Sequence, residues 1–267
     1  MLAGVEVMLE VRKVTMDFGG VRALDEASFK AEEGVITGLI GPNGAGKTTM
    51  FDVIFGFLRP TSGEVLFKGR RIDGLEPHII ARMRIGRTFQ IIRIFPKMTV
   101  MDNILCAAQN HPGEGLLMSI FPLPGVRKRE DEARLKALEL LELVGLKEKK
   151  DEKAGTLSYG EQKMLEFARA LMVEPEFIFL DEPMAGLNLE MKRFMGKILL
   201  DLKRAGRGVL IIEHDMSAIM SISDRVVVLN FGKVIATGTP SEIQNNPLVI
   251  EAYLGEEQRR AGEPDAS

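Results

Sequence analysis

The glycine-rich segment GPNGAGKT, residues 41–48, constrains the fold of this chain more than any other stretch. It matches the pattern GxxxxGK[ST], follows the apolar run VITGLI (35–40) and precedes the helical pattern KTTMFDVIFGFL (47–58). A buried strand, a loop of backbone N–H groups and a helix N-terminus in this order are typical of a phosphate-binding loop. The alternative is a glycine-rich turn with an ordinary surface lysine, and the flanking strand and helix patterns disfavour it.

The residue types in this loop indicate how it would hold a nucleotide. Glycines let backbone N–H groups surround phosphate oxygens. Lys47 would reach the β- and γ-phosphates, and the Thr48 hydroxyl would ligate Mg²⁺. We therefore expect the whole loop to contact the nucleotide, through Gly41, Pro42, Asn43, Gly44, Ala45, Gly46, Lys47, Thr48 and Thr49.

Polar side chains follow two further buried-strand patterns. FIFLDEP (177–183) places Asp181 and Glu182 at a strand end, and VLIIEHD (209–215) places His214 after another. Ligands bind at the carboxyl ends of parallel strands, so we expect Asp181 to hold the magnesium and Glu182 to orient and deprotonate an attacking water. A neutral His214 could hydrogen-bond the γ-phosphate or that water. Acidic pairs after strands also cap helices, which is the alternative for Asp181 and Glu182.

Two more residues are weaker candidates. Gln90 ends the strand-like segment IGRTFQ, and its amide could contact a metal-bound water and pass information on nucleotide state to the next part of the chain. A solvated glutamine at a strand end is the alternative. Phe18, in MDFGG, could stack on an adenine ring, although a phenylalanine before a turn more often packs in the core.

The pattern of apolar runs predicts an α/β fold with a parallel sheet, because short branched-residue strands alternate with helical segments. The first thirty-odd residues and EVLFKGRRI (64–72) indicate a small antiparallel layer. From about Ile91 to Val173 helical signals dominate, including Thr99 with Asp102 as an N-cap pair and the amphipathic run KREDEARLKALELLELV. We therefore predict an α/β nucleotide-binding core of residues 1–90 and 174–254, an inserted helical lobe of residues 91–173 and a flexible tail of residues 255–267.

Composition narrows the classes of partner. Lys+Arg 35 against Asp+Glu 38 gives the 267-residue chain a net charge of -3, so there is no basic footprint for nucleic acid. No run approaches the roughly 18 consecutive apolar residues of a membrane-spanning helix. If the chain serves a membrane process, other subunits must span the bilayer. Cys106 is the single cysteine, and we expect it to be a small buried apolar residue.

The segment LSYGEQ (157–162) looks like a second anion-binding helix start. Ser158 and Glu161 have capping-box spacing, and Gly160 would leave backbone exposed to an anion. The alternative is a capped helix with no ligand. A second such helix has no obvious use in one chain whose glycine-rich loop would already bind phosphate.

Together these motifs resemble the nucleotide-binding subunits of ABC transporters in order and approximate spacing: GPNGAGKTT, Gln90, LSYGEQ, FIFLDEP, AGLN (185–188) and IEHD (212–215). The resemblance covers nearly the whole chain and implies a P-loop NTPase core of the ABC ATPase type that hydrolyses ATP with Mg²⁺. Within that superfamily, RTFQIIRIFPKMTVMDN, AGLN, IEHDM and NNPLVIEAYLG look like the ATP-binding proteins of branched-chain amino acid importers.

The resemblance also implies partners. Ser158, Gly160 and Glu161 would close over ATP held by the phosphate loop of a second chain, in a homodimer or a heterodimer with a paralogous ATP-binding subunit. The dimer would energise integral membrane permease subunits, and indirectly a solute-binding protein, from the cytoplasmic face of the cell membrane. Three residues depart from the usual family pattern: Tyr159 stands where glycine is common, Glu161 where glutamine is common and Asn188 where aspartate is frequent.

Two other functions compete with this interpretation. A soluble ABC-type ATPase of a non-transport assembly, such as cofactor-cluster building, would share the same motifs. A small-molecule kinase or a GTPase would share only the phosphate loop, and the chain lacks an NKxD-like guanine-reading segment. Neither of the latter two classes explains LSYGEQ.

Overall fold

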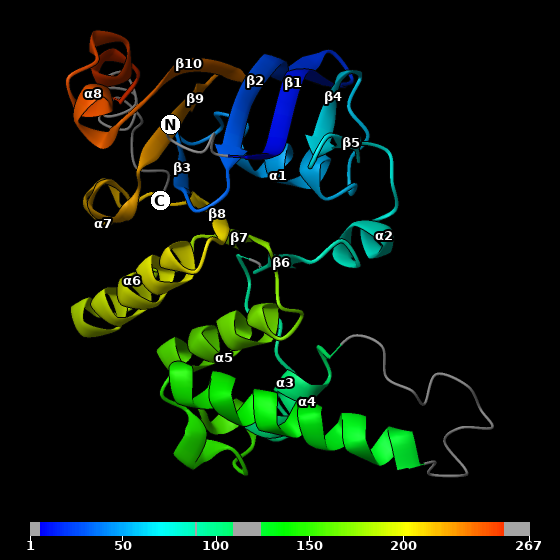
Figure 1. The fold of residues 1–267 in the computed structure, drawn as a ribbon. Coiled ribbons are helices and arrows are strands. Elements are labelled where there is room, and N and C mark those ends of the chain that lie inside the picture. The colour runs from blue at the N-terminus through cyan, green and yellow to red at the C-terminus, as the bar shows by residue number, and fades with distance from the viewer. Residues whose placement is uncertain (1–5, 89, 109–123, 254–267) are drawn as a thin grey trace, which may run out of the picture. The chain divides into compact units, whose positions relative to one another are not determined.

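The computed structural model describes residues 6–88, 90–108 and 124–253, and it has the α/β architecture that the sequence predicts (Figure 1). Two compact units make up the chain. The first contains the residues up to Met83 and those from Leu199 onward, and the second contains Arg84–Ile198. The predicted lobe of residues 91–173 falls within the second unit, and its limits as a separate lobe stay a prediction.

Parallel strands form the centre of the first unit. β3 (Ile36–Ile40) pairs in parallel with β8 (Gly208–Ile212) on one side and with β9 (Arg225–Asn230) on the other. β10 (Lys233–Gly238) then pairs antiparallel with β9. Every residue of β3 and β8 is buried, which explains why these strands read as continuous apolar runs and not as alternating ones.

The first unit also contains the predicted antiparallel layer, a sheet of order β2-β1-β4-β5. Its strands are β1 (Val7–Phe18), β2 (Val21–Glu32), β4 (Ser62–Phe67) and β5 (Arg70–Arg71). Gly19 and Gly20, both with positive φ, form the two-residue turn between β1 and β2. This confirms the antiparallel layer.

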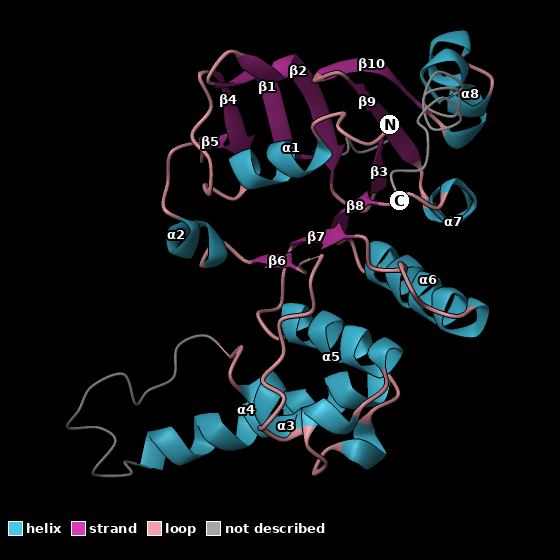
Figure 2. Cartoon of the chain, turned by 180° about the vertical axis from the view of Figure 1, so that it is seen from behind, coloured by secondary structure: helices cyan, strands magenta, loops and turns pink. Residues whose placement is uncertain are grey.

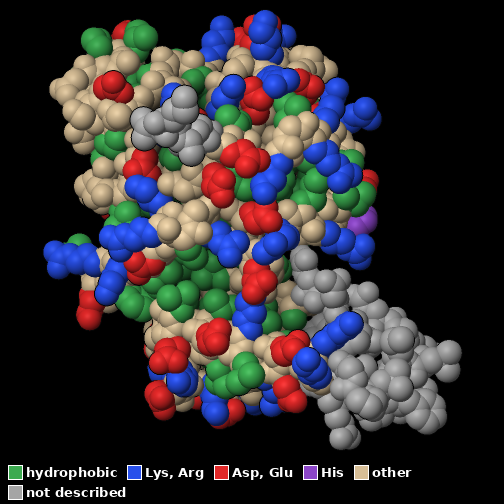
Figure 3. All heavy atoms as spheres, viewed as in Figure 1, with side chains coloured by type: hydrophobic (Ala, Val, Ile, Leu, Met, Phe, Trp, Pro, Cys, Tyr) green, Lys and Arg blue, Asp and Glu red, His purple; other side chains and the backbone are tan. Residues whose placement is uncertain are grey.

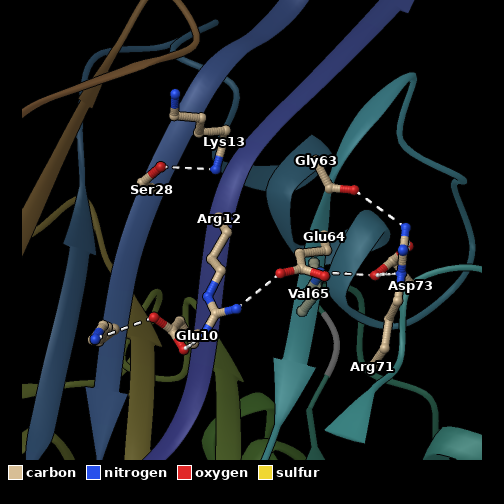
Figure 4. A network of polar contacts seen from close by, with 10 residues as sticks. Glu10, Arg12, Lys13, Ser28, Gly63, Glu64, Val65, Arg71 and Asp73 are labelled. Carbon is tan, nitrogen blue, oxygen red and sulfur yellow. Dashed lines mark hydrogen bonds and ion pairs between the residues drawn. The ribbon is translucent and has the colours of Figure 1, made fainter. Parts of the chain in front are cut away.

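Charged side chains cross the strands of this sheet (Figure 4). Arg12 on β1 lies between two carboxylates, 2.6 Å from Glu10 and 2.9 Å from Glu64 on β4. Glu10 also pairs with Lys30 on β2 at 3.1 Å, and hydrogen bonds from Arg12 and Lys30 lower the pKa of Glu10. Such exposed pairs add little stability individually, but opposite charges across strands favour this register over slipped ones.

The first unit also contains the helices α1 (Lys47–Ile54), α2 (Pro77–Ala81), α7 (Met216–Ile222) and α8 (Pro240–Gln244). α1 contacts β2 (Figure 2), and most of its apolar residues are buried. Since α1 begins directly after the glycine-rich loop, this packing fixes where the loop lies.

The second unit is mainly helical. It contains α3 (Val100–Leu105), α4 (Pro124–Leu143) and α5 (Tyr159–Leu171), which contact one another, and two 3₁₀ turns at Lys147–Lys149 and Ala154–Thr156. β6 (Ile85–Arg87) pairs in parallel with β7 (Phe177–Asp181). α6 (Leu189–Arg204) begins in this unit and ends beyond its last residue, Ile198.

Several local predictions can be compared with the structure. Thr99 caps α3, because its hydroxyl oxygen accepts a hydrogen bond from the Asp102 N–H at 3.0 Å, as expected. The expectation for Cys106 was wrong, since it is exposed just after α3 ends. The tail of residues 255–267 lies outside the described residues.

Two further observations concern the surface and the membrane. On the face shown in Figure 3, basic and acidic side chains are interspersed, with no extended patch of one sign. Among the residues that the structure describes, no helix combines the length and the apolar content that crossing a bilayer requires.

Candidate functional site

The phosphate-loop candidate lies between the end of β3 and the start of α1. Lys47 is only 6 % exposed, and its Nζ donates hydrogen bonds to the carbonyl oxygens of Gly41 at 2.7 Å and Pro42 at 2.8 Å. The loop therefore curls around the ammonium group of its own lysine. A phosphate would offer that ammonium group stronger, charged acceptors than the two carbonyls.

Backbone groups of β9 and of the β9–β10 turn contact the loop. The Gly232 N–H, in the β9–β10 turn, donates to the Ala45 carbonyl at 2.9 Å, and the Ala45 N–H donates to the Pro42 carbonyl at 3.2 Å. Gly41 has no room for a side chain, because a Cβ there would lie 2.0 Å from the Leu229 carbonyl oxygen. The backbone of this loop is thus held rigidly by hydrogen bonds and close packing.

The opposite side of the loop is open. Asn43, Gly44 and Thr48 are exposed, and Thr49 is half-buried in the first turn of α1. α1 starts after Gly46 with no side-chain cap, so no side chain of the cap residue covers its first N–H groups. Backbone N–H groups at an uncapped helix start, beside a lysine, form an arrangement suited to an anion.

Phe18 ends β1 at the hairpin next to this loop. Its side chain is 44 % exposed, and its cross-strand partner Val21 is exposed as well. β2 passes close to the loop, because a Cβ on Gly46 would lie 2.6 Å from the Ala23 carbonyl oxygen. An exposed aromatic ring in this neighbourhood is compatible with stacking on a base, which stays a prediction for Phe18.

In the second unit, Asp181 is the last residue of β7 and is buried. Its backbone N–H donates to the Thr88 hydroxyl at 3.2 Å, and the Thr88 N–H donates to the Phe179 carbonyl at 3.0 Å. Thr88 follows β6, so this side chain ties the carboxyl ends of β6 and β7 together. The pairing fixes the point at which the acidic residues leave the strand.

Glu182 and Gln90, selected separately from the sequence, are in contact. The Gln90 Nε2 donates to the Glu182 Oε1 at 3.1 Å. Glu182 has a φ of 49°, in the left-handed region that a residue with a side chain seldom adopts. β6 ends at Arg87, so Gln90 lies three residues beyond the strand, not at its end as predicted.

His214 follows β8 in the first unit and is exposed. The next residue, Asp215, caps α7 by accepting a hydrogen bond from the Ala218 N–H at 3.1 Å. His214 therefore sits at a fixed junction between a buried strand and a capped helix. Its contact with a γ-phosphate or an attacking water stays a prediction.

The capping box predicted for LSYGEQ is confirmed. The Ser158 hydroxyl oxygen accepts from the Glu161 N–H at 3.4 Å, and the Glu161 Oε2 accepts from the Ser158 N–H at 2.9 Å. The Lys149 Nζ donates to the other Glu161 oxygen at 2.7 Å. This hydrogen bond and those from Ser158 lower the pKa of Glu161.

Tyr159 and Asn188, which depart from the usual family pattern, have local structural roles. The Tyr159 ring lies against Gly186, where an added Cβ would be 2.7 Å from the ring Cε1. The Asn188 Oδ1 accepts from the Met191 N–H at 2.9 Å and so caps α6. Asparagine caps helices as well as aspartate does, so the absent charge costs the helix little.

Two positions close to Asp181 and Glu182 were not predicted from the sequence, namely Thr88 and Lys163. Lys163 lies on α5, is 5 % exposed, and donates from Nζ to the Glu182 carbonyl at 2.6 Å. A lysine within the largely apolar, buried face of KMLEFARAL, which also holds the buried Glu166, was the available signal, because a buried ammonium needs a partner.

The oxygen-bearing side chains predicted to bind magnesium are those of Thr48, Gln90 and Asp181. A hydroxyl, an amide and a carboxylate suit Mg²⁺, which prefers oxygen ligands and retains several waters. Within the described ranges no cluster of three or more His, Cys, Asp or Glu could form a metal cage. Each of the three side chains has the ligand chemistry that Mg²⁺ prefers.

Comparison with known proteins identifies similar chains. Residues 24–185 match the family model described as ABC transporter, and residues 233–258 match that of the branched-chain amino acid ATP-binding cassette transporter. The chain is 45 % identical over 250 residues to the high-affinity branched-chain amino acid transport ATP-binding protein BraF of Pseudomonas aeruginosa, covering 93 % of this chain and 98 % of BraF.

Solved structures give the same likeness. The ADP conformation of MJ1267, an ATP-binding cassette of an ABC transporter, has a TM-score of 0.81 at 37 % identity, covering 94 % of this chain and 99 % of that one. The dimeric structure of MJ0796, a bacterial ABC transporter cassette, has a TM-score of 0.73 at 25 % identity, covering 87 % and 99 %.

Proposed function

The chain belongs to the ABC transporter family of ATPases, and we propose that it energises uptake of branched-chain amino acids through separate membrane permease subunits. The observation that carries this proposal is the 45 % identity to BraF along 98 % of that protein's length. The match of residues 233–258 to the branched-chain amino acid cassette model supports the same solute class. A non-transport ATPase assembly is disfavoured, because the relative and the family model are both named for transport.

ATP would bind first through the glycine-rich loop. Lys47 would exchange the Gly41 and Pro42 carbonyls for β- and γ-phosphate oxygens, and the N–H groups of the loop and of the first turn of α1 would surround the same phosphates. Phe18 would stack on the adenine ring. The open side of the loop, at Asn43, Gly44 and Thr48, would face the phosphates.

Hydrolysis would use the polar residues at the strand ends. Glu182 would accept the proton of the attacking water, Gln90 would orient the Glu182 carboxylate, and His214 would contact the γ-phosphate. Thr48, Asp181 and Gln90 would hold Mg²⁺, which supplies charge neutralisation at the β- and γ-phosphates. The hydrogen bond from Gln90 to Glu182 supports these roles, because it joins the amide that would contact Mg²⁺ to the carboxylate that would act as the base.

Two chains would share each nucleotide. Ser158, Gly160 and the backbone N–H groups at the start of α5 would face ATP held by the loop of a partner chain, identical or paralogous, in a symmetric pair of sites. The capped, exposed start of α5 supports this arrangement, as does the dimeric state of the MJ0796 cassette. The dimer would dock on permeases at the cytoplasmic face of the cell membrane, with a solute-binding protein as an indirect partner.

The test uses two substitutions that act at different steps. Glu182→Gln removes the base, so ATP binding should persist while turnover falls by about 10²- to 10⁴-fold and an ATP-bound dimer accumulates in size-exclusion chromatography. Ser158→Arg adds a bulky charge at the start of α5, so ATP should still bind but the dimer should not form. Ser241→Arg, an exposed serine on α8, is the matched control and should dimerise normally.

Three outcomes would overturn parts of the proposal. Unchanged turnover in Glu182→Gln would remove the assigned base. Normal ATP-dependent dimerisation of Ser158→Arg would remove the contact between chains. If affinity purification of the chain from its native membranes recovered soluble partners and no multi-span subunit, the transport function would be contradicted.

A further inference from the structure

Lys163 lies where a charged side chain is expensive to keep. It belongs to the buried face of α5, where the next two residues, Met164 and Leu165, are also buried. Its ammonium group contacts the segment that follows β7. An ammonium group removed from water needs strong acceptors to remain charged. The Glu182 carbonyl oxygen provides one at 2.6 Å, and the Tyr159 ring centroid lies 5.7 Å from the same Nζ.

The acceptor belongs to a backbone position that needs support. Glu182 has a positive φ of 49°, a conformation that is strained for a residue with a side chain unless its surroundings stabilise it. Its carbonyl oxygen accepts from the Ala185 N–H at 3.3 Å as well as from Lys163. Lys163 therefore helps to hold the peptide group directly after the carboxylate-bearing residue.

The side chain of Glu182 is fixed from another direction. Gln90 donates to Glu182 Oε1 at 3.1 Å, while Lys163 contacts the carbonyl oxygen of the same residue at 2.6 Å. One contact orients the carboxylate and the other orients the backbone that carries it. Without Lys163, the peptide could rotate away from the left-handed region and redirect the carboxylate.

A second contact joins α5 to the same segment. The Tyr159 ring occupies the space above Gly186, and a Cβ on Gly160 would lie 2.5 Å from the Met191 Sδ. The first turn of α5 is thus packed against residues 186–191 while Lys163, one turn later, contacts Glu182. This explains why a tyrosine is accommodated at position 159, since its ring packs along the chain's own loop.

We propose that Lys163 is a positioning residue, which holds the backbone of Glu182 in the conformation that directs its carboxylate at the attacking water. The proposal rests on the proposed function of Glu182 as the base. In this role Lys163 would act through the Glu182 backbone and not by contact with the nucleotide. Its removal should therefore slow the chemical step and leave nucleotide binding intact.

The experiment replaces Lys163 with methionine, which keeps the length and apolar stem of the side chain but cannot donate. Lys147→Met, an exposed lysine of the same unit that pairs with Glu142 at 2.9 Å, is the matched control. Steady-state hydrolysis of MgATP gives kcat and KM on the full-length chain, and the fluorescent analogue mant-ATP gives the binding constant. Circular dichroism melting checks that each variant is folded.

We expect kcat of Lys163→Met to fall by about 10- to 100-fold, because small misplacement of a catalytic group has effects of this size, while KM and mant-ATP affinity change by less than about twofold. Lys163→Arg should retain more activity than Lys163→Met, since it can still donate. Lys147→Met should match the wild type. If Lys163→Met does not fold, Lys163→Leu serves as the variant that cannot donate, with the same expectation.

Failure of this inference can be separated from failure of the proposed function. If Glu182→Gln is inactive but folded Lys163→Met or Lys163→Leu turns over ATP at the wild-type rate, the positioning role is wrong. Equal activity of the arginine and methionine variants, or a loss confined to nucleotide affinity, would also overturn it. If instead Glu182→Gln retains full turnover, the base assignment itself is wrong.

Discussion

Two glycines of the phosphate loop should respond very differently to the same substitution. A Cβ at Gly41 would lie 2.0 Å from the Leu229 carbonyl oxygen, whereas ordinary van der Waals contact begins at 3.4 Å. Both groups belong to backbone, so neither can turn aside. A Cβ at Gly44 meets nothing within 4 Å, and its only structural cost is the positive φ of 74°.

The two alanine substitutions should therefore destabilise the protein by different amounts. Gly41→Ala must push the loop away from β9, and overpacking of this kind costs about 3 kcal/mol. Gly44→Ala costs about 1 kcal/mol from backbone strain alone. Its methyl group would enter the open side of the loop, where we place the phosphates, so loss of a hydrogen bond to a charged group should weaken ATP binding by about tenfold or more.

Urea unfolding followed by circular dichroism measures the first effect, and mant-ATP titration measures the second. Gly41→Ala should have a much lower unfolding midpoint than Gly44→Ala, with an unchanged denaturant slope for both. If the two alanine variants were equally stable, the close contact between Gly41 and Leu229 would not constrain the loop. If Gly44→Ala bound ATP with wild-type affinity, the open side of the loop would not be the phosphate side.

Two further predictions concern helix starts in the second unit. Thr99→Ala removes the cap of α3, so the unfolding free energy should fall by about 1 kcal/mol with ATP affinity unchanged, and an unaltered urea midpoint would contradict the cap. The lowered pKa of Glu161 means that its contribution to stability is present above the unfolded value of 4.5 and is lost as pH falls through the lower folded value. The stability difference between wild type and Glu161→Gln should therefore shrink between pH 7 and pH 3, and a constant difference across that range would contradict the link to Lys149.

Much of the fold could be predicted because its signals are local. β3, β7 and β8 are buried throughout, so each appears as a continuous apolar run ending in polar residues. The caps at Thr99 and Ser158 depend on side chains three residues apart, which spacing alone reveals. The strand β9 was missed although RVVVLN carries the same branched-residue signal.

The features that could not be predicted from the sequence depend on tertiary contacts. Nothing near Lys163 in the sequence shows that its ammonium group contacts a carbonyl nineteen positions later. The contact of Gln90 with Glu182 joins residues 92 positions apart, so both residues could be selected from the sequence but their contact could not be predicted. The apolar character of cysteine predicts a buried side chain for Cys106. The residue follows the last residue of the short helix α3, and there its side chain is exposed.

We propose that two chains together hydrolyse each ATP, because the loop that would bind the phosphates and the α5 start that would close over them come from different molecules. Specific ATPase activity, measured as a function of chain concentration from nanomolar to micromolar, tests it most directly. Activity per chain should rise steeply with concentration and then reach a plateau as dimers form. Constant activity per chain down to concentrations at which light scattering detects only monomers would contradict it.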